Sequence, residues 1–253
     1  MTHIIKLSYL ISEQGEIRDE FYKKELNPSF WNSNGEFDQG VRKKLLEIAE
    51  DFFKDLKINA PVEDIQLTGS LANFNWTRNS DLDVHILIDF SKIDPNKELV
   101  KKGLDGQRFV WNLRHNVVIR NHDIELYAQD VIEPHVASGL FSLLHNKWIK
   151  EPKLSDPQID YKDVDSKFNG FVSDIQEIQN KLSSDVASEE EARELYDHTL
   201  RIKTKILKSR KEGLANSGEF SVENLAFKKL RNEGYIEKLI DLISKAYSKI
   251  YNE

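Results

Sequence analysis

The segment DLDVHILIDF, residues 81–90, places two aspartates inside an otherwise apolar run. Successive side chains of a β-strand point to opposite faces, so a strand here would bury Leu82 and Val84 and leave Asp81 and Asp83 together on the other face. Two neighbouring carboxylates repel each other, and a cation that neutralises both is the simplest reason for such a pair. The segment therefore predicts a strand with one core face and one metal-binding face.

The remaining sequence predicts a mixed α+β core followed by helices. Strand-forming runs occupy 3–11, 65–67, 82–90, 117–120 and 124–129, with a polar turn at 121–123. Apolar residues at helical spacing predict helices at 38–56 and 97–114, and then, beyond Pro152 and Pro157, at 168–182, from 188 to about 213, from 221 to 234 and at 236–250. We expect a mixed-sheet domain over residues 1–154 and an α-helical domain over residues 155–253.

Composition narrows the class of protein. The 253 residues, 39% hydrophobic and 31% charged, suffice for one large or two modest domains. The N-terminus lacks the pattern of a secretory signal and there is no long apolar run, so we expect a cytoplasmic protein with no membrane partner. The absence of cysteine excludes disulfides, zinc-thiolate sites and thiol nucleophiles. A net charge of -7 argues mildly against a broad nucleic-acid-binding surface.

A Gly-Ser pair precedes the aspartates. Gly69 and Ser70 follow the short expected strand at 65–67 and precede residues 71–74, which read as a helix start. Backbone N–H groups and the Ser70 hydroxyl in such a turn can cradle a phosphate, and glycine permits its close approach. An Asp-x-Asp pair alone is a weak signal for a metal site. A phosphate cradle beside it is the arrangement that metal-assisted phosphoryl or nucleotidyl transfer requires.

The combination of Gly69-Ser70, a ten-residue spacer and Asp81-Leu82-Asp83-Val84 resembles the signature of the DNA polymerase β-type nucleotidyltransferase superfamily. The resemblance implies a nucleotidyltransferase-like mixed sheet with helices, and an NTP whose triphosphate rests on Gly69 and Ser70. It also implies two Mg²⁺ ions, with Mn²⁺ as a possible replacement, shared by three carboxylates. In layout the chain is similar to minimal or small-molecule nucleotidyltransferases, including uncharacterised members from large phages.

The third carboxylate of this signature lies on a later strand. Glu125, within the expected strand at 124–129, fits best, and its metal-ligand set would be Asp81, Asp83 and Glu125. The resemblance gives Glu125 the role of ligand to the second ion and of base for the acceptor hydroxyl. Asp123 is the competing residue, which we place at the turn.

Four further side chains are candidates for nucleotide binding. Trp76 and Arg78 lie in the spacer and would stack on a base or hold a phosphate, or else Trp76 simply anchors the loop. His85 shares the face of the aspartates and either touches a phosphate or makes an ordinary hydrogen bond at the sheet. Lys205 belongs to a basic helix face that is either solvated or binds the triphosphate.

The leading interpretation is a magnesium-dependent nucleotidyltransferase. It would transfer a nucleoside monophosphate from an NTP to an acceptor hydroxyl on an RNA end, a small molecule or a protein, with release of pyrophosphate. The alternative is a catalytically silent nucleotide-binding module, regulatory or antitoxin-like. The intact carboxylates argue against this alternative, because mutually repelling acids serve no purpose once the metal is lost.

Overall fold

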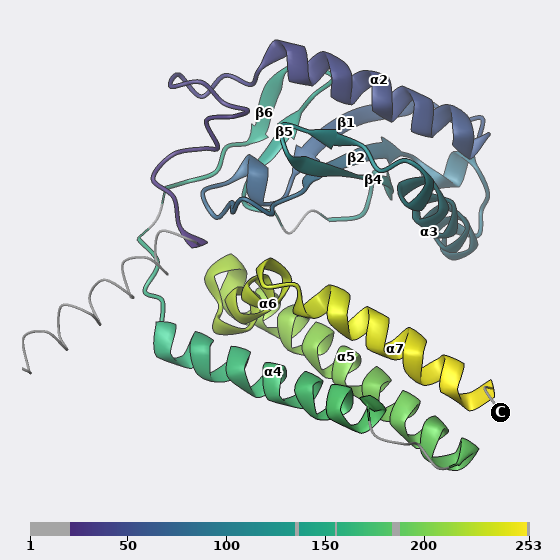
Figure 1. Ribbon diagram of the computed structural model, residues 1–253. Helices are drawn as coiled ribbons and strands as arrows, with labels where there is room; N and C mark the ends of the chain where they lie inside the picture. Colours follow the sequence, from purple (N-terminus) through teal and green to yellow (C-terminus); the bar gives the residue numbers. More distant parts are fainter. Residues whose placement is uncertain (1–20, 135–136, 155, 184–187, 252–253) are drawn as a thin grey trace, which may run out of the picture. The chain divides into compact units, whose positions relative to one another are not determined.

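The computed structural model describes residues 21–134, 137–154, 156–183 and 188–251 (Figure 1). The strand expected at 3–11 lies outside these residues. The chain forms two compact units, within residues 1–155 and within residues 156–253, and each is considered by itself. The described residues form a mixed α and β structure with six α-helices and one six-stranded sheet.

The sheet belongs to the first unit and has the strand order β3-β4-β2-β1-β5-β6. The central strands β2 and β4 are parallel, and every other neighbouring pair is antiparallel. This makes the sheet mixed, as expected. The strands are β1 (Val62–Thr68), β2 (Leu82–Ile88), β3 (Val118–Ile119), β4 (His122–Asp130), β5 (Leu140–Ser142) and β6 (Lys147–Lys150).

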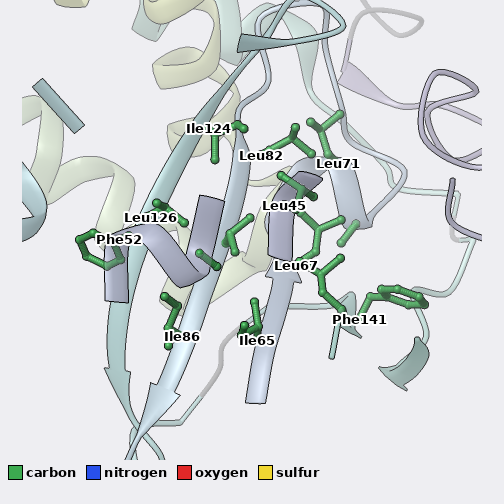
Figure 2. Close-up of a cluster of buried hydrophobic side chains, with 14 of the residues drawn as sticks. Leu45, Phe52, Ile65, Leu67, Leu71, Leu82, Ile86, Ile124, Leu126 and Phe141 are labelled. Carbon is green, nitrogen blue, oxygen red and sulfur yellow. The ribbon is translucent and has the colours of Figure 1, made fainter. Parts of the chain in front are cut away.

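Two helices bury one face of the sheet. Helix α2 (Gln39–Leu56) begins after Asp38, whose side chain accepts a hydrogen bond from the Val41 N–H, and α3 (Lys97–Arg114) begins after the capping residue Asn96. Figure 2 shows the resulting core, in which Leu45 and Phe52 of α2 lie among side chains of β1, β2 and β4. The opposite face of the sheet is therefore left for polar chemistry.

The alternation expected for β2 is confirmed. Leu82, Val84, Ile86 and Ile88 are fully buried, whereas the residues between them are half-buried. The strand ends at Ile88 rather than at residue 90, because the side chain of Asp89 accepts a hydrogen bond from the Ser91 N–H and starts a 3-10 turn.

The turn expected at 121–123 is wrong by about two residues. Strands β3 and β4 are joined by Arg120 and Asn121, which have φ angles of 52° and 65°, as a tight hairpin turn requires. His122 is buried in β4 because its Nδ1 contacts the Ser80 carbonyl and its ring packs edge-on against Phe30. Asp123 is therefore a strand residue rather than a turn residue.

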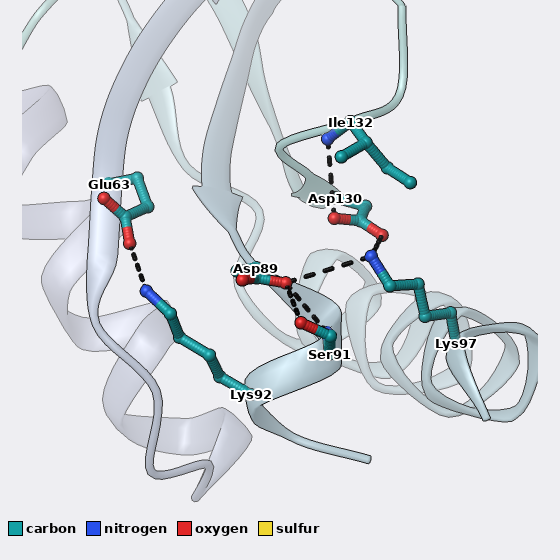
Figure 3. A network of polar contacts seen from close by, with 7 residues as sticks. All are labelled: Glu63, Asp89, Ser91, Lys92, Lys97, Asp130 and Ile132. Carbon is teal, nitrogen blue, oxygen red and sulfur yellow. Dashed lines mark hydrogen bonds and ion pairs between the residues drawn. The ribbon is translucent and has the colours of Figure 1, made fainter. Parts of the chain in front are cut away.

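A charged network joins α3 to the ends of β2 and β4 (Figure 3). Lys97 Nζ lies 3.0 Å from Asp130 Oδ2 and 3.8 Å from Asp89 Oδ1. The Asp130 side chain is only 9% exposed, and Lys97 is the cation that lies against its carboxylate. The network thus fixes the N-terminal end of α3 against the sheet, at the opposite end of β2 from Asp83.

We expect Lys97→Met to lower the free energy of unfolding by about 1–2 kcal/mol, because it leaves the Asp130 carboxylate without its cation. Lys102→Met is the matched control in the same helix: its pair with Glu98 is exposed on both sides, so its loss should cost less than about 0.5 kcal/mol. Urea unfolding measures both. Equal losses in the two variants would show that the Lys97 network contributes no more than a surface pair.

The second unit is helical, as expected, and consists of α4 (Tyr161–Ser183), α5 (Glu189–Ser217), α6 (Val222–Asn232) and α7 (Tyr235–Tyr251). Ser188 and Ser221 cap α5 and α6. Helix α5 continues past Gly213, where the sequence predicted its end. A Cβ at that position would lie 2.5 Å from Glu223 Cβ, so the glycine permits close packing of α5 against the first residues of α6. None of the helices in the described part of the chain combines the length and the apolar run that a membrane crossing requires.

Candidate functional site

The connection between β1 and β2 brings a glycine against an aspartate. Gly69 has a φ of 73°, and a Cβ built on it would lie 2.0 Å from Asp83 Oδ2. Because a real Cβ never approaches an oxygen so closely, only glycine fits beside this carboxylate. The Gly69-Ser70 turn and the second aspartate of the motif are therefore in direct proximity.

The residues after Gly69 form a single 3-10 turn, η1 (Ser70–Ala72), and not the expected start of a helix. One turn lacks the aligned peptides of a helix N-terminus, so any phosphate cradle here depends on local groups and not on a helix dipole. Trp31 holds this turn by donating from Nε1 to the Leu71 carbonyl at 2.8 Å. The hydrogen bond from Trp31, which comes from a distant part of the chain, therefore holds this short turn in place.

Ser70 ties the turn to the beginning of β2. Its hydroxyl donates to Ser80 Oγ at 2.7 Å, and Ser80 Oγ also accepts from the Thr77 N–H at 2.8 Å. Ser80 is almost fully buried. The ten-residue spacer is thus folded back so that both halves of the sequence motif meet.

Asp83 and Glu125 are neighbours across the parallel strands. Asp83 of β2 is in register with Glu125 of β4, so their backbones are about 5 Å apart. Alternation puts both side chains on the face opposite the core, and both are half-buried. Asp81 lies just before β2, on the same face by alternation, and is also half-buried. The structure thus brings together Gly69, Asp83 and Glu125, with Asp81 at their margin.

Asp123 shares the face of Glu125, because it lies two residues earlier in the same strand. The sequence argument that set it aside as a turn residue is therefore wrong. Asp123 is exposed, however, whereas Glu125 is half-buried and directly opposite Asp83. Its position next to Asp83 makes Glu125 the better candidate for the third carboxylate.

Tyr127 adds a hydroxyl to the carboxylate pair. Its Oη donates a hydrogen bond to Glu125 Oε2. Burial, and then the negative charges of Asp83 and Glu125, raise the pKa of the Tyr127 phenol well above its usual range. The phenol therefore stays protonated and remains a donor at any physiological pH. Tyr127 follows Glu125 at i+2 in β4, and this spacing, which puts both side chains on one strand face, is the sequence signal for the contact.

The other candidate residues have more varied surroundings. Trp76 Nε1 donates to the Glu25 carbonyl at 2.9 Å and Lys23 lies over its ring, so Trp76 anchors the spacer. Arg78 is exposed on the same spacer. Lys205, in the second unit, pairs with Asp174 at 2.7 Å. These contacts favour the anchoring interpretation for Trp76 and give Lys205 a partner within its own unit.

The acidic side chains do not form a finished metal cage. Among the described residues, no group of three or more His, Asp or Glu side chains is arranged to hold a metal ion. Asp83 and Glu125 nevertheless supply hard oxygen ligands side by side, and Mg²⁺ is commonly held by one or two carboxylates together with water and substrate phosphates. The pair fits a metal that the nucleotide helps to bind.

No protein-family model matches the sequence, and no curated protein or solved structure is significantly similar to it. The functional argument therefore rests on the residues of this site and on the motif that they form.

Proposed function

We propose that the chain is a cytoplasmic, magnesium-dependent nucleotidyltransferase with a nucleotidyltransferase-like core, which transfers a nucleoside monophosphate from an NTP to an acceptor hydroxyl. The observation that carries the proposal is the juxtaposition of Gly69 with the Asp83 carboxylate, next to Glu125 on the adjacent strand. A turn without side-chain bulk beside paired carboxylates suits a triphosphate bound with its metal.

Asp81, Asp83 and Glu125 would hold the metal. When bound, magnesium neutralises the triphosphate and lowers the pKa of the acceptor hydroxyl. The Gly69-Ser70 turn would receive the phosphates, and Arg78, exposed on the spacer, stays a candidate for binding the triphosphate. The acceptor oxygen forms a bond to the α-phosphorus, the bond between the α-phosphorus and its bridging oxygen breaks, and pyrophosphate leaves. The hydroxyl proton passes to Glu125.

The test is to incubate the full chain with each of the four NTPs and Mg²⁺, with Mn²⁺ in parallel, and with RNA ends, hydroxyl-bearing small molecules and proteins as acceptors. We expect pyrophosphate release and transfer of the nucleoside monophosphate with at least one combination, and loss of both on adding EDTA. Tight NTP binding without pyrophosphate release across all acceptors would instead support the silent nucleotide-binding module.

The two candidate third carboxylates are distinguished by matched neutral variants. We expect Glu125→Gln to lower kcat by about 10²-fold, because a general base contributes at least this much, and Asp123→Asn to leave kcat close to the wild-type value. Both variants remove one negative charge from the same face of β4, so a general charge effect would act on both. A larger loss in Asp123→Asn would give the role of third carboxylate to Asp123.

A further inference from the structure

The hydroxyl of Tyr127 occupies one of the two oxygens of the Glu125 carboxylate. The residues lie at i and i+2 on one face of β4, and Tyr127 Oη donates to Glu125 Oε2. A glutamate side chain has three rotatable bonds, so a hydrogen bond from a neighbour restricts its orientation strongly. The bond engages Oε2 and does not involve the other carboxylate oxygen.

The Tyr127 ring is itself held from two neighbouring elements. His85 of β2 is in register with Tyr127, and the two rings stack with centroids 4.7 Å apart. The Arg108 guanidinium of α3 lies 4.4 Å from the centre of the same ring. His85 Nδ1 in turn contacts Gln129 Oε1, which fixes the imidazole. A chain of contacts thus runs from Gln129 through His85 and Tyr127 to Glu125.

These contacts hold a hydroxyl in place, and the hydroxyl holds a carboxylate. Partners that hydrogen-bond a metal-ligating carboxylate orient it, and their removal typically weakens metal binding or activity by about 10–100-fold. A tyrosine with a purely structural role would need no contact with the acid, since its ring packing alone would serve. We propose that Tyr127 is a positioning residue, which orients the Glu125 carboxylate toward Asp83 for metal binding. The expected effect of Tyr127 on turnover rests on the proposed function, whereas its effect on the orientation of the Glu125 carboxylate does not.

The test uses electron paramagnetic resonance to measure Mn²⁺ binding to the wild-type chain and to Tyr127→Phe, in the absence of nucleotide. We expect Mn²⁺ affinity to fall by about 10–100-fold while ring packing is retained. In the turnover assay we expect kcat to fall and the KM for NTP to stay close to the wild-type value, because the phosphates would bind at the Gly69-Ser70 turn. Tyr235→Phe, which removes a phenol hydroxyl from the second unit, is the matched control and should leave the affinity unchanged.

A double-mutant cycle with Glu125→Gln shows whether Tyr127 acts through Glu125. We expect Tyr127→Phe to cause no additional loss of Mn²⁺ affinity in the Glu125→Gln background, whereas a purely structural role predicts additive losses. If Tyr127→Phe does not fold, Arg108→Met keeps the hydroxyl, removes the cation over the ring, and should weaken Mn²⁺ binding in the same direction to a smaller degree.

Each outcome separates this proposal from the proposed function. Mn²⁺ affinity equal to wild type in Tyr127→Phe, or in Arg108→Met where that variant replaces it, overturns the positioning role. Wild-type chain that binds no Mn²⁺ in the absence of nucleotide overturns the positioning role, whereas the pyrophosphate assay with NTP present decides the nucleotidyltransferase. Wild-type chain that binds Mn²⁺ but releases no pyrophosphate overturns the nucleotidyltransferase alone, and the comparison of affinities still decides the role of Tyr127.

Discussion

Asp83→Asn is expected to lower pyrophosphate release by about 10³-fold or more. Asparagine keeps the shape of the side chain and removes its charge, so the variant loses several kcal/mol of charge stabilisation, and each 1.36 kcal/mol is about tenfold in rate. We expect the largest effect at Asp83 because its carboxylate lies against Gly69 and because Asp83 is also in register with Glu125. The measurement is kcat with the NTP that supports the fastest wild-type reaction.

The same variant is expected to keep or raise the free energy of unfolding, because it removes one of two neighbouring carboxylates that repel each other. Residues that serve function at a cost in stability behave in this way. Asp105→Asn, at an exposed position of α3, removes one carboxylate away from the site and should leave kcat unchanged. Wild-type turnover in Asp83→Asn would remove Asp83 from the catalytic machinery, and a marked loss of stability would show that its role is structural.

The elements with a regular local pattern could be predicted from the sequence. Helix α3 was predicted at its observed bounds, α2 was predicted to within one residue, and the alternation of β2 gave its buried and its half-buried face. In each case the period of apolar residues extends over seven or more positions. Such a pattern encodes which face is buried before any tertiary contact is known.

The β5-β6 hairpin was missed because its burial is not local. Each strand is only three or four residues long, too short to show a period. Phe141 and Trp148 are held there by Trp31, which stacks on Trp148 with ring centroids 4.5 Å apart and meets Phe141 edge-on. These contacts join residues more than a hundred positions apart, so no window of the sequence contains them.

The position of the β3-β4 turn could not be read for a similar reason. Three polar residues at 121–123 resemble a turn, yet the buried His122 is satisfied by the Ser80 carbonyl from another part of the chain. Composition identifies a polar residue but not its partner. Because the turn was predicted at 121–123, Asp123 was assigned to the turn and not to the strand.

The candidate site was predicted as a set of residues and not as a geometry. The spacing of Gly69, Asp81 and Asp83 indicated the chemistry, and the strand around Glu125 indicated a third acid. The contact between Gly69 and the Asp83 carboxylate, and the bond from Ser70 to Ser80, depend on how the spacer folds back. The expected helix at 71–74 is one 3-10 turn, so the local structure after Gly69 differs from the prediction.

The Gly69→Ala variant should separate two effects of this glycine: its close approach to the Asp83 carboxylate, which we expect to govern kcat, and its backbone conformation, which we expect to govern stability. The added Cβ would meet Asp83 Oδ2 at 2.0 Å, so the carboxylate must move by more than 1 Å, and a displacement of about 1 Å at a reacting centre can cost about 10²-fold in rate. We therefore expect kcat to fall roughly 10²- to 10³-fold. A residue other than glycine at a φ of 73° and a ψ of -160° is also strained, which should lower the free energy of unfolding by roughly 1–3 kcal/mol.

Gly35→Ala is the matched control, because Gly35 has a φ of 74° and nothing within 4 Å of the added Cβ. It should lose stability through strain and keep wild-type kcat. If Gly69→Ala also keeps wild-type kcat while losing stability, the glycine serves only the backbone, and the closeness of the turn to Asp83 has no catalytic meaning. If kcat falls in Gly69→Ala alone, the position of the Asp83 carboxylate limits turnover.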